Sequence, residues 1–240
     1  MSNQYQDARR NLAAVLRWSA REGFQEAAGN HCSLSVSEDG SRFLINPDGR
    51  YFSTLKSSDL VLVDLNEQAG TDAANLSAWL LHGRILQRVD GAKCVLHLHP
   101  KYATVISTLA DSTIYPIDQV GMRFYERIGF DNEFSGMIVQ KSEADRLCDK
   151  LSDKQILIMG NHGVTVVGAT VAQAFDELYH LERACETLVT AYMTGQPLRV
   201  VSDDVAGRTS QHWQDFLYSA DLHFAEFRKV LDREEPDYAD

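Results

Sequence analysis

The segment from residue 94 to residue 100 limits the possible folds of this chain more than any other part of it. Apolar residues alternate there with His97 and His99, which predicts a strand with one side facing the core and the other carrying both imidazoles. Side chains two residues apart on a strand have Cβ atoms roughly 6–7 Å apart, so these two rings can approach one ion. Pro100 has no N–H group and ends the strand, which places the rings where α/β folds build their sites. The alternative is a pair of ordinary histidines hydrogen-bonded in a polar core.

A third histidine favours the metal-binding interpretation. Two short apolar runs, residues 156–159 and 164–167, predict buried strands that are separated by Gly-Asn-His-Gly. The two glycines permit a bend that re-aims the side chain of His162. The candidate metal ligands are therefore His97, His99 and His162.

Composition narrows the class of protein. The 240 residues, 44% of them hydrophobic, are enough for one domain over residues 1–240 with a single large core. Acidic residues outnumber basic ones by 34 to 23, and the net charge of −11 argues against binding to nucleic acid or to an anionic membrane. The four cysteines show no Cys-x-x-Cys spacing, which predicts reduced core residues. Because there is neither a basic, then apolar N-terminal segment nor a run near the roughly 20 apolar residues of a membrane span, we expect a soluble, cytoplasmic protein.

Hydrophobic periodicity predicts a mixture of strands and helices. The expected helices cover residues 5–22, 76–89, 101–109, 142–151, 170–195 and 209–232. The expected strands cover residues 33–36, 42–45, 60–64, 94–99, 113–115, 136–139, 156–159 and 164–167. Irregular chain is expected over 118–135 and a loop over 197–208. The last helix has more aromatic surface than a small core contact needs, so we expect it to pack on another subunit or in a deep groove of its own domain.

Five short motifs carry a resemblance to a known family. In chain order they are Gly29-Asn30, Asn46-Pro47-x-Gly49, His97-x-His99-Pro100, Asn161-His162-Gly163 with Gly168 shortly after, and Leu181-Glu182. Together they resemble the class II aldolase and adducin-head family over roughly residues 10–195.

The resemblance implies an α/β fold, namely a three-layer α/β/α sandwich with a largely antiparallel central sheet. It also implies a homo-oligomer, commonly a tetramer with sites between subunits. In the enzymes of the family a divalent metal, usually zinc, is held at the positions that match His97, His99 and His162 here. Manganese and iron also suit nitrogen ligands of this kind.

The chain departs from the family in the predicted helix 76–89. The sugar-phosphate aldolases and epimerases of the family carry Ser-Ser-Glu-Trp there, whereas this chain has Leu-Ser-Ala-Trp, which keeps Ser77 but places Ala78 at the position of glutamate. A methyl group can neither bind a metal nor move a proton, so their retro-aldol mechanism cannot be carried over unchanged. The phosphate loop also lacks a serine before Gly29 and Asn30, and we therefore expect a non-phosphorylated substrate.

The candidate metal site limits the chemistry. Three neutral imidazoles leave a divalent ion its full charge, which favours anionic, chelating substrates. Decarboxylation of a β-keto acid needs an electron sink but no base to remove a proton from carbon. It therefore depends less on the missing glutamate than isomerisation does. Retro-aldol cleavage needs a base for the substrate hydroxyl, and the candidates are His31, Tyr125 and a metal-bound hydroxide.

Further polar residues are candidates for substrate binding. Arg123 offers a two-point fork to a carboxylate, with a surface ion pair as the alternative. His82, one turn after Ala78, could approach the site, although a helix histidine bonded to backbone or water is the simpler interpretation. The expected substrate-binding residues are Gly29, Asn30, Ser77 and Arg123.

Three functions remain open from the sequence. The first is a metal-dependent lyase, a decarboxylase or an aldolase, acting on a small oxo or hydroxy carboxylate. The second is a binding or structural module like the adducin head, which has no need of three convergent imidazoles. The third is iron-dependent oxygenation, since three neutral nitrogen ligands can also hold Fe(II).

Overall fold

The computed structural model of the chain describes residues 5–67, 75–216 and 218–240. At its centre a seven-stranded sheet has the order β3-β2-β1-β4-β7-β6-β5, and every neighbouring pair is antiparallel except β5 and β6. The strands are β1 (His31–Ser35), β2 (Arg42–Ile45), β3 (Val61–Asp64), β4 (Cys94–Leu98), β5 (Ile128–Asp131), β6 (Ile156–Met159) and β7 (Gly163–Gly168). The α-helices are α1 (Gln6–Arg21), α2 (Leu76–Arg88), α3 (Lys101–Ser107), α4 (Gln119–Met122), α5 (Lys141–Leu151), α6 (Val171–Met193), α7 (Asp203–Asp215) and α8 (Tyr218–Glu234).

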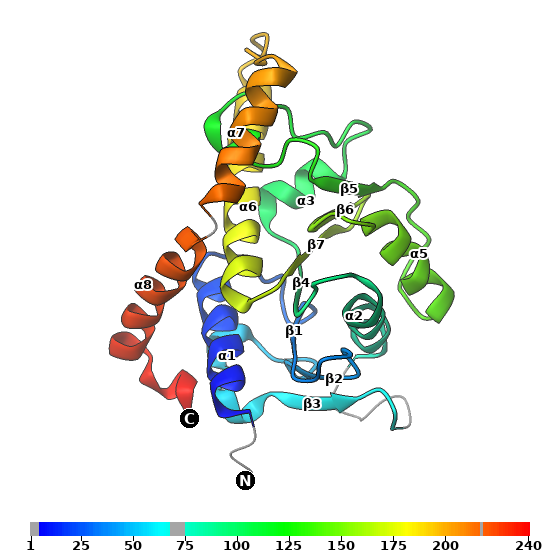
Figure 1. The fold of residues 1–240 in the computed structure, drawn as a ribbon, viewed down its shortest axis with the longest axis vertical. Helices are drawn as coiled ribbons and strands as arrows, with labels where there is room; N and C mark the ends of the chain where they lie inside the picture. The colour runs from blue at the N-terminus through cyan, green and yellow to red at the C-terminus, as the bar shows by residue number, and fades with distance from the viewer. Residues whose placement is uncertain (1–4, 68–74, 217) are drawn as a thin grey trace.

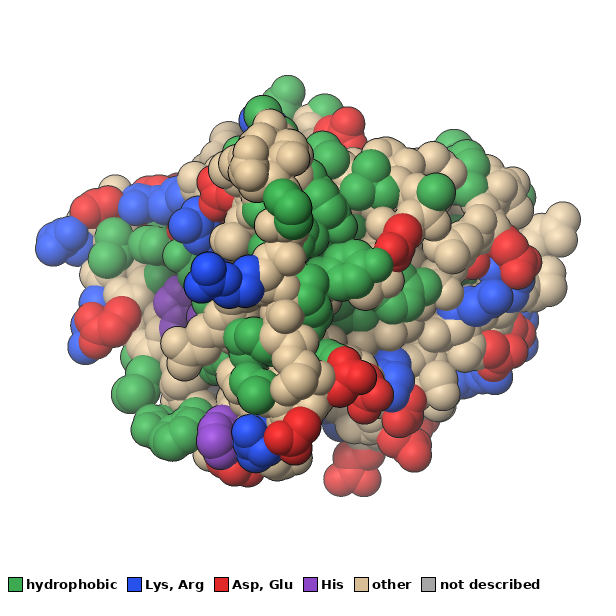
Figure 2. Space-filling model, turned by 90° about the horizontal axis from the view of Figure 1, so that it is seen from above, with side chains coloured by type: hydrophobic (Ala, Val, Ile, Leu, Met, Phe, Trp, Pro, Cys, Tyr) green, Lys and Arg blue, Asp and Glu red, His purple; other side chains and the backbone are tan. Residues whose placement is uncertain are grey.

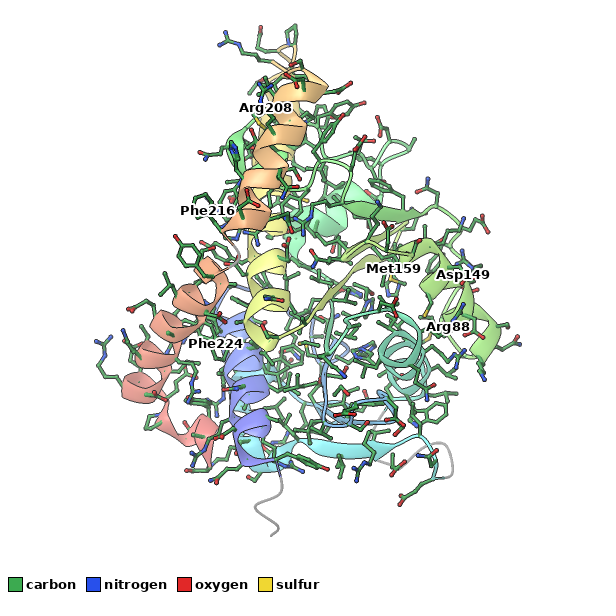
Figure 3. The ribbon with its side chains drawn as sticks, viewed as in Figure 1. Arg88, Asp149, Met159, Arg208, Phe216 and Phe224 are labelled. Carbon is green, nitrogen blue, oxygen red and sulfur yellow. The ribbon has the colours of Figure 1, made fainter. Side chains whose placement is uncertain are left out.

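Helices cover both faces of the sheet (Figure 1). On one face α1, α3, α6 and α8 form a large core with the sheet, and on the other face α2 and α5 form a smaller one. Arg88 of α2 and Asp149 of α5 are joined by an ion pair of 2.7 Å, and both are labelled in Figure 3. The alternation of β4 explains the layering, because Leu96 faces the first core and Val95 the second. The expected three-layer α/β/α sandwich with a largely antiparallel sheet is confirmed.

Side-chain caps set the starts of two helices. The side chain of Asn75 accepts a hydrogen bond of 2.9 Å from the N–H of Ser77 at the start of α2. Thr170 Oγ1 accepts one of 3.1 Å from the N–H of Gln173 at the start of α6. In the ranges that the structure describes, no helix is both long enough and apolar enough to cross a membrane.

The region between α3 and α5 differs from the prediction. Strand β5 lies within the stretch 118–135 that the sequence predicts to be irregular, and it pairs with β6 over four residues. Gly129 allows this strand to pass α5, because a Cβ there would lie 2.5 Å from the carbonyl oxygen of Lys150. The predicted strands over 113–115 and 136–139 are not strands in the structure. In the second of them Met137 and Val139 are exposed, and only Ile138 is buried, in the smaller core.

The C-terminal region contains two helices where the sequence predicts one over 209–232. The first, α7, begins at Asp203, inside the predicted loop 197–208, and residue 217 of the predicted helix lies outside the described residues. Phe227 of α8 stacks on Trp18 at 5.1 Å between ring centroids and meets Phe175 at 5.2 Å, so this part of the aromatic stripe fills a groove of its own domain.

Another part of that stripe is exposed. Phe216, labelled in Figure 3, is 53% exposed, and Tyr218 and Leu222 are each 60% exposed. A separate, broad patch of hydrophobic side chains lies on the face seen from above, with acidic and basic side chains toward its edges (Figure 2). The predicted contact of the C-terminal helix, residues 209–232, with another subunit stays a prediction.

Candidate metal centre

Three histidines converge at one end of the central strands. His97 lies in β4, His99 follows that strand, and His162 lies in the turn between β6 and β7. One ring nitrogen from each lies within 4.8 Å of those from the other two, and the ring centroids are 4.8 to 5.2 Å apart. The structure thus brings together the three residues that the sequence selects as metal ligands.

The chain bends at His162 as the sequence predicts, but the residue whose backbone makes the bend is not a glycine. The left-handed conformation falls on Asn161, with φ of 57°, and not on the flanking glycines. Gly163 is needed for close approach, because a Cβ there would lie 2.4 Å from Cδ2 of His99. This glycine therefore lets the rings of His99 and His162 meet.

The orientation of the His97 ring follows from its partner in β7. Its Nδ1 lies 3.1 Å from Oγ1 of Thr165, whose hydroxyl donates to Sδ of Met159 at 3.3 Å. Because that hydroxyl proton is already used, the oxygen accepts a hydrogen bond from the N–H at Nδ1 of His97. The lone pair of Nε2 is then left for a metal ion.

His99 is held by a residue that sequence analysis missed. Its Nδ1 lies 2.5 Å from Oε2 of Glu26, and a carboxylate only accepts, so Nδ1 of His99 donates. Its Nε2 is buried with no hydrogen-bond partner among the described residues. A histidine held on one nitrogen by a carboxylate and open on the other is the usual arrangement of a metal ligand. Glu26 lies four residues before Asn30 in a loop, where no periodic pattern marks it.

The residues present therefore suit a metal ion. Burial lowers the pKa of His162 to about 4, and neighbouring His99 adds to the effect. Burial likewise lowers the pKa of His97 well below its ordinary range. The rings of His97 and His162 are therefore neutral at neutral pH, which is the form that binds metal, and three imidazole nitrogens suit zinc, manganese or iron.

Glu182, from the last motif, fixes the chain just beyond the histidine pair. Its two carboxylate oxygens accept hydrogen bonds of 2.8 Å from the N–H groups of Tyr102 and Ala103, at the start of α3. Since Pro100 is the residue before α3, this contact holds the end of β4 against α6.

Two more histidines extend the site along β1. The ring of His31 stacks on that of His97, with centroids 4.8 Å apart and planes at 26°. Its Nδ1 lies 2.7 Å from Nε2 of His82, whose Nδ1 lies 2.5 Å from Oγ of Ser33. Burial, with smaller contributions from His162 and His99, lowers the pKa of His31 to about 3. His82 of α2 thus reaches the site and bonds to side chains, not to backbone or water as the simpler interpretation has it.

The loop before β1 lies beside the same histidines. Oδ1 of Asn30 accepts a hydrogen bond of 2.6 Å from the N–H of Glu26, and Gly29 closes the turn by donating to the carbonyl oxygen of Glu26. Nδ2 of Asn30 is buried without a partner in the described chain. Gly29 and Asn30 are therefore joined to the metal centre through Glu26.

Two expected site residues are not brought to the histidines. Ser77 donates to the carbonyl oxygen of Ile138 at 2.6 Å, and Ala78 lies in the smaller core. Tyr125 lines a pocket of about 320 Å³ with residues of the 113–116 segment and Asp203, and none of the three candidate ligands lines that pocket. Within one chain Ser77 and Tyr125 therefore have no contact with the candidate ligands.

Arg123 is buried elsewhere, in a group of residues that we call the arginine cluster. Its Nη2 lies 2.7 Å from Oδ2 of Asp176 and 3.2 Å from Oε1 of Glu177, and its guanidinium lies over the ring of Trp213. The cluster consists of Arg123, Arg127, Asp176, Glu177 and His223. The expectation of a free carboxylate-binding fork is corrected, and so is its alternative of a surface ion pair, because α6 supplies two buried carboxylates to this guanidinium.

Comparisons with known proteins agree with this geometry. The family model described as "Class II Aldolase and Adducin N-terminal domain" matches residues 10–189. The crystal structure of an aldolase II superfamily protein from Pseudomonas syringae superposes with a TM-score of 0.89 at 26% identity, covering 100% of this chain and 98% of that one.

Two curated relatives carry the names of activities. The decarboxylase NovR of Streptomyces niveus is 26% identical, over 80% of this chain and 72% of its own. A 4-hydroxy-3-prenylphenylpyruvate oxygenase/4-hydroxy-3-prenylbenzoate synthase of Streptomyces roseochromogenus is 26% identical, over 76% of this chain and 67% of its own.

Proposed function

Because the chain belongs to the class II aldolase and adducin N-terminal domain family, we propose that it is a metal-dependent lyase. Its substrate is a small, non-phosphorylated oxo or hydroxy carboxylate, in which it cleaves a C–C bond by decarboxylation or retro-aldol reaction. One observation carries the proposal: three convergent imidazoles, one of which has a buried nitrogen without a partner. The decarboxylase name of one relative supports the reaction class.

The histidines and the loop before β1 have separate tasks in this proposal. His97, His99 and His162 hold a divalent ion, zinc in the first place, with manganese and iron also suited. The ion supplies an electron sink for the substrate carbonyl. Asn30 contributes its unpartnered Nδ2 donor to the anionic substrate, next to the backbone of Gly29.

Two residues of α2 bear on the substrate and on the reaction. Ser77 argues against a phosphate group, and Ala78 argues against proton abstraction from carbon. The hydroxyl of Ser77 is used by the carbonyl oxygen of Ile138, so it is not free for a phosphate group. Ala78 lies in a hydrophobic core and offers no proton acceptor, which favours a reaction without proton abstraction from carbon.

The test measures metal and turnover together. Protein loaded with zinc, manganese or iron is incubated with a panel of oxo and hydroxy acids, and released carbon dioxide and carbonyl products are followed. We expect turnover that is lost in His97→Ala and kept in the matched control His212→Ala, which changes a histidine of α7. Absence of turnover with every metal and acid would favour the alternative, a non-catalytic module like the adducin head.

Iron-dependent oxygenation is a second candidate. The oxygenase name of one relative favours it, and three nitrogen ligands suit Fe(II) as well as zinc. Turnover of the same acids in the absence of oxygen would reject it. Activity only with iron and oxygen would reject the lyase.

The family resemblance also favours assembly into a homo-oligomer, with a tetramer as the expected form. The exposed side chains of Phe216, Tyr218 and Leu222 are a candidate contact surface. Sedimentation of the wild-type protein and of Leu222→Asp measures this directly, and a monomeric wild type would contradict it.

A further inference from the structure

A hydrogen-bonded chain of side chains runs from the core to the candidate metal centre. It begins at Ser33, passes through His82 and ends at His31, with heavy-atom distances of 2.5 and 2.7 Å. Each imidazole in it is buried, and a neutral imidazole carries one proton on one of its two nitrogens. The chain can therefore point in only two directions, and these present different groups to the metal centre.

Ser33 decides between the two directions. Its side chain is fully buried, and within the described residues its Oγ has one hydrogen-bond partner, Nδ1 of His82. If His82 donated to Ser33, the hydroxyl proton would be buried with no acceptor. If Ser33 donates, the one proton left over is on Nε2 of His31, whose residue is 8% exposed, and not on the hydroxyl of Ser33, which is 0% exposed. The hydroxyl of Ser33 is therefore the donor.

The remaining protons follow in order. With Nδ1 of His82 accepting, its Nε2 carries the proton and donates to Nδ1 of His31. His31 is then protonated on Nε2. This nitrogen is a hydrogen-bond donor and has no lone pair with which to act as a base.

The position of His31 directs that donor to the candidate site. His31 stands opposite His97 in the register of β1 and β4, and its ring stacks on that of His97. It is not one of the three residues whose ring nitrogens converge, so its place is beside the ligands and not among them. Thr165 is the other neighbour of His97 in the sheet. Its hydrogen bond to Nδ1 holds the His97 ring in the orientation that leaves Nε2 of His97 free.

We propose that His31 donates a hydrogen bond from Nε2 to an oxygen of the anionic substrate bound beside His97, and that Ser33 and His82 are positioning residues that fix this direction. The inference rests on the proposed function for the existence of a substrate, but the direction of the hydrogen bonds does not. His31 is thereby assigned to binding and stabilising negative charge, in place of the role of base that the sequence left open for it.

The direction is tested by NMR of the full-length protein with ¹⁵N-labelled histidine, both metal-free and loaded with zinc. Shifts of the ring nitrogens distinguish the two neutral tautomers. We expect Nε2–H for His31 and for His82. In Ser33→Ala the population of Nδ1–H at His31 should rise, and Ser33→Thr, which keeps the hydroxyl, should restore the wild-type tautomer. Nδ1–H at His31 in the wild type would overturn the proposal.

The donor role is tested with oxalate, a chelating dianion, titrated into zinc-loaded protein by calorimetry. We expect His31→Phe, which keeps a flat ring on His97 but no N–H, to weaken oxalate binding by about 10-fold or more at unchanged zinc content. His31→Gln, which keeps an N–H, should show a smaller loss of oxalate affinity, and His212→Phe should bind oxalate as the wild type does.

The outcomes separate this proposal from the function on which it rests. Loss of zinc in His31→Phe would make His31 a ligand and overturn the donor role, as would unchanged oxalate affinity. A wild-type protein that takes up no zinc would overturn the proposed function itself, while the tautomer of His31 is still read on the same sample.

Discussion

Two buried polar clusters of the described chain, the arginine cluster and the candidate metal centre, differ in what they leave unpaired. In the arginine cluster each carboxylate has partners: Asp176 meets Arg123 and His223, and Glu177 meets both arginines. At the candidate metal centre, in contrast, Nε2 of His99 is buried and has no partner among the described residues. Buried polar groups are normally satisfied, so the first cluster has the character of a structural element and the second that of a binding site. If this contrast is real, mutations in the two clusters will change different properties.

The largest effect is expected in the arginine cluster. Arg123→Met removes the cation that Asp176 and Glu177 share, which leaves buried Asp176 without a guanidinium partner and Glu177 with Arg127 alone. We expect a loss of about 3–5 kcal/mol in the free energy of unfolding, measured with urea, at unchanged zinc content of the folded protein. Arg208→Met, at an exposed position of α7 labelled in Figure 3, should stay within about 0.5 kcal/mol of the wild type. Loss of zinc without loss of stability in Arg123→Met would break the comparison.

The opposite result is expected at the candidate metal centre. The double variant His97→Ala, His99→Ala removes two of three ligands, so zinc affinity should fall by more than about 100-fold. Elemental analysis and a competing chelator measure this, with circular dichroism as the check on folding and His212→Ala as the matched control. A double variant that keeps its full zinc content would show that the rings are ordinary core histidines.

Glu26 tests the comparison further, because it is an acidic residue that holds one of the histidines of the candidate metal centre. Glu26→Gln keeps the shape of the side chain but weakens its hold on Nδ1 of His99. Since Glu26 is 67% exposed, we expect a zinc affinity lower by roughly 10-fold, at the small end of such effects. Glu38→Gln, at an exposed position after β1, is the control. Equal affinities of the two variants would mean that Glu26 has no part in the site.

The smallest effect concerns pH and the metal-free protein. The pKa of His162 is about 4 in the folded chain, against 6.5 for a histidine side chain in water, so between these values the unfolded chain binds a proton that the native one does not. Stability therefore falls as pH falls from 6.5. His162→Asn removes this linkage and should lessen the loss between about pH 6.5 and 5.5 by at most about 1 kcal/mol, measured by urea unfolding in chelator. An equal or steeper loss in the variant would contradict the neutral state of His162.

The sequence predicts the candidate metal centre better than its surroundings, for a physical reason. His97 lies in a strand and His99 directly after it, in a segment whose alternation is a local signal, and the glycines around His162 indicate a bend without knowledge of the rest of the chain. The surroundings of Arg123 are not predicted, because its partners follow 53 and 54 residues later, on the helix that covers the sheet. Glu26 belongs to a loop without period, so only the folded chain shows that it meets His99.

The same distinction holds for the fold. Strands β4, β6 and β7 are buried on both sides, and their mostly apolar residues predict them well. β5 is short and contains Gly129, so its pairing with β6 decides its conformation. The run around Met137 has the composition of a strand but no neighbour with which to pair.

The pairing of the three central strands places His31, His97 and Thr165 side by side in one row across the sheet. A slip of β4 by a single residue would turn His97 to the opposite face, into the layer now filled by Leu96 and its neighbours. A sheet misaligned in this way would separate His97 from His162, so the proposed metal site depends on the native register of β4.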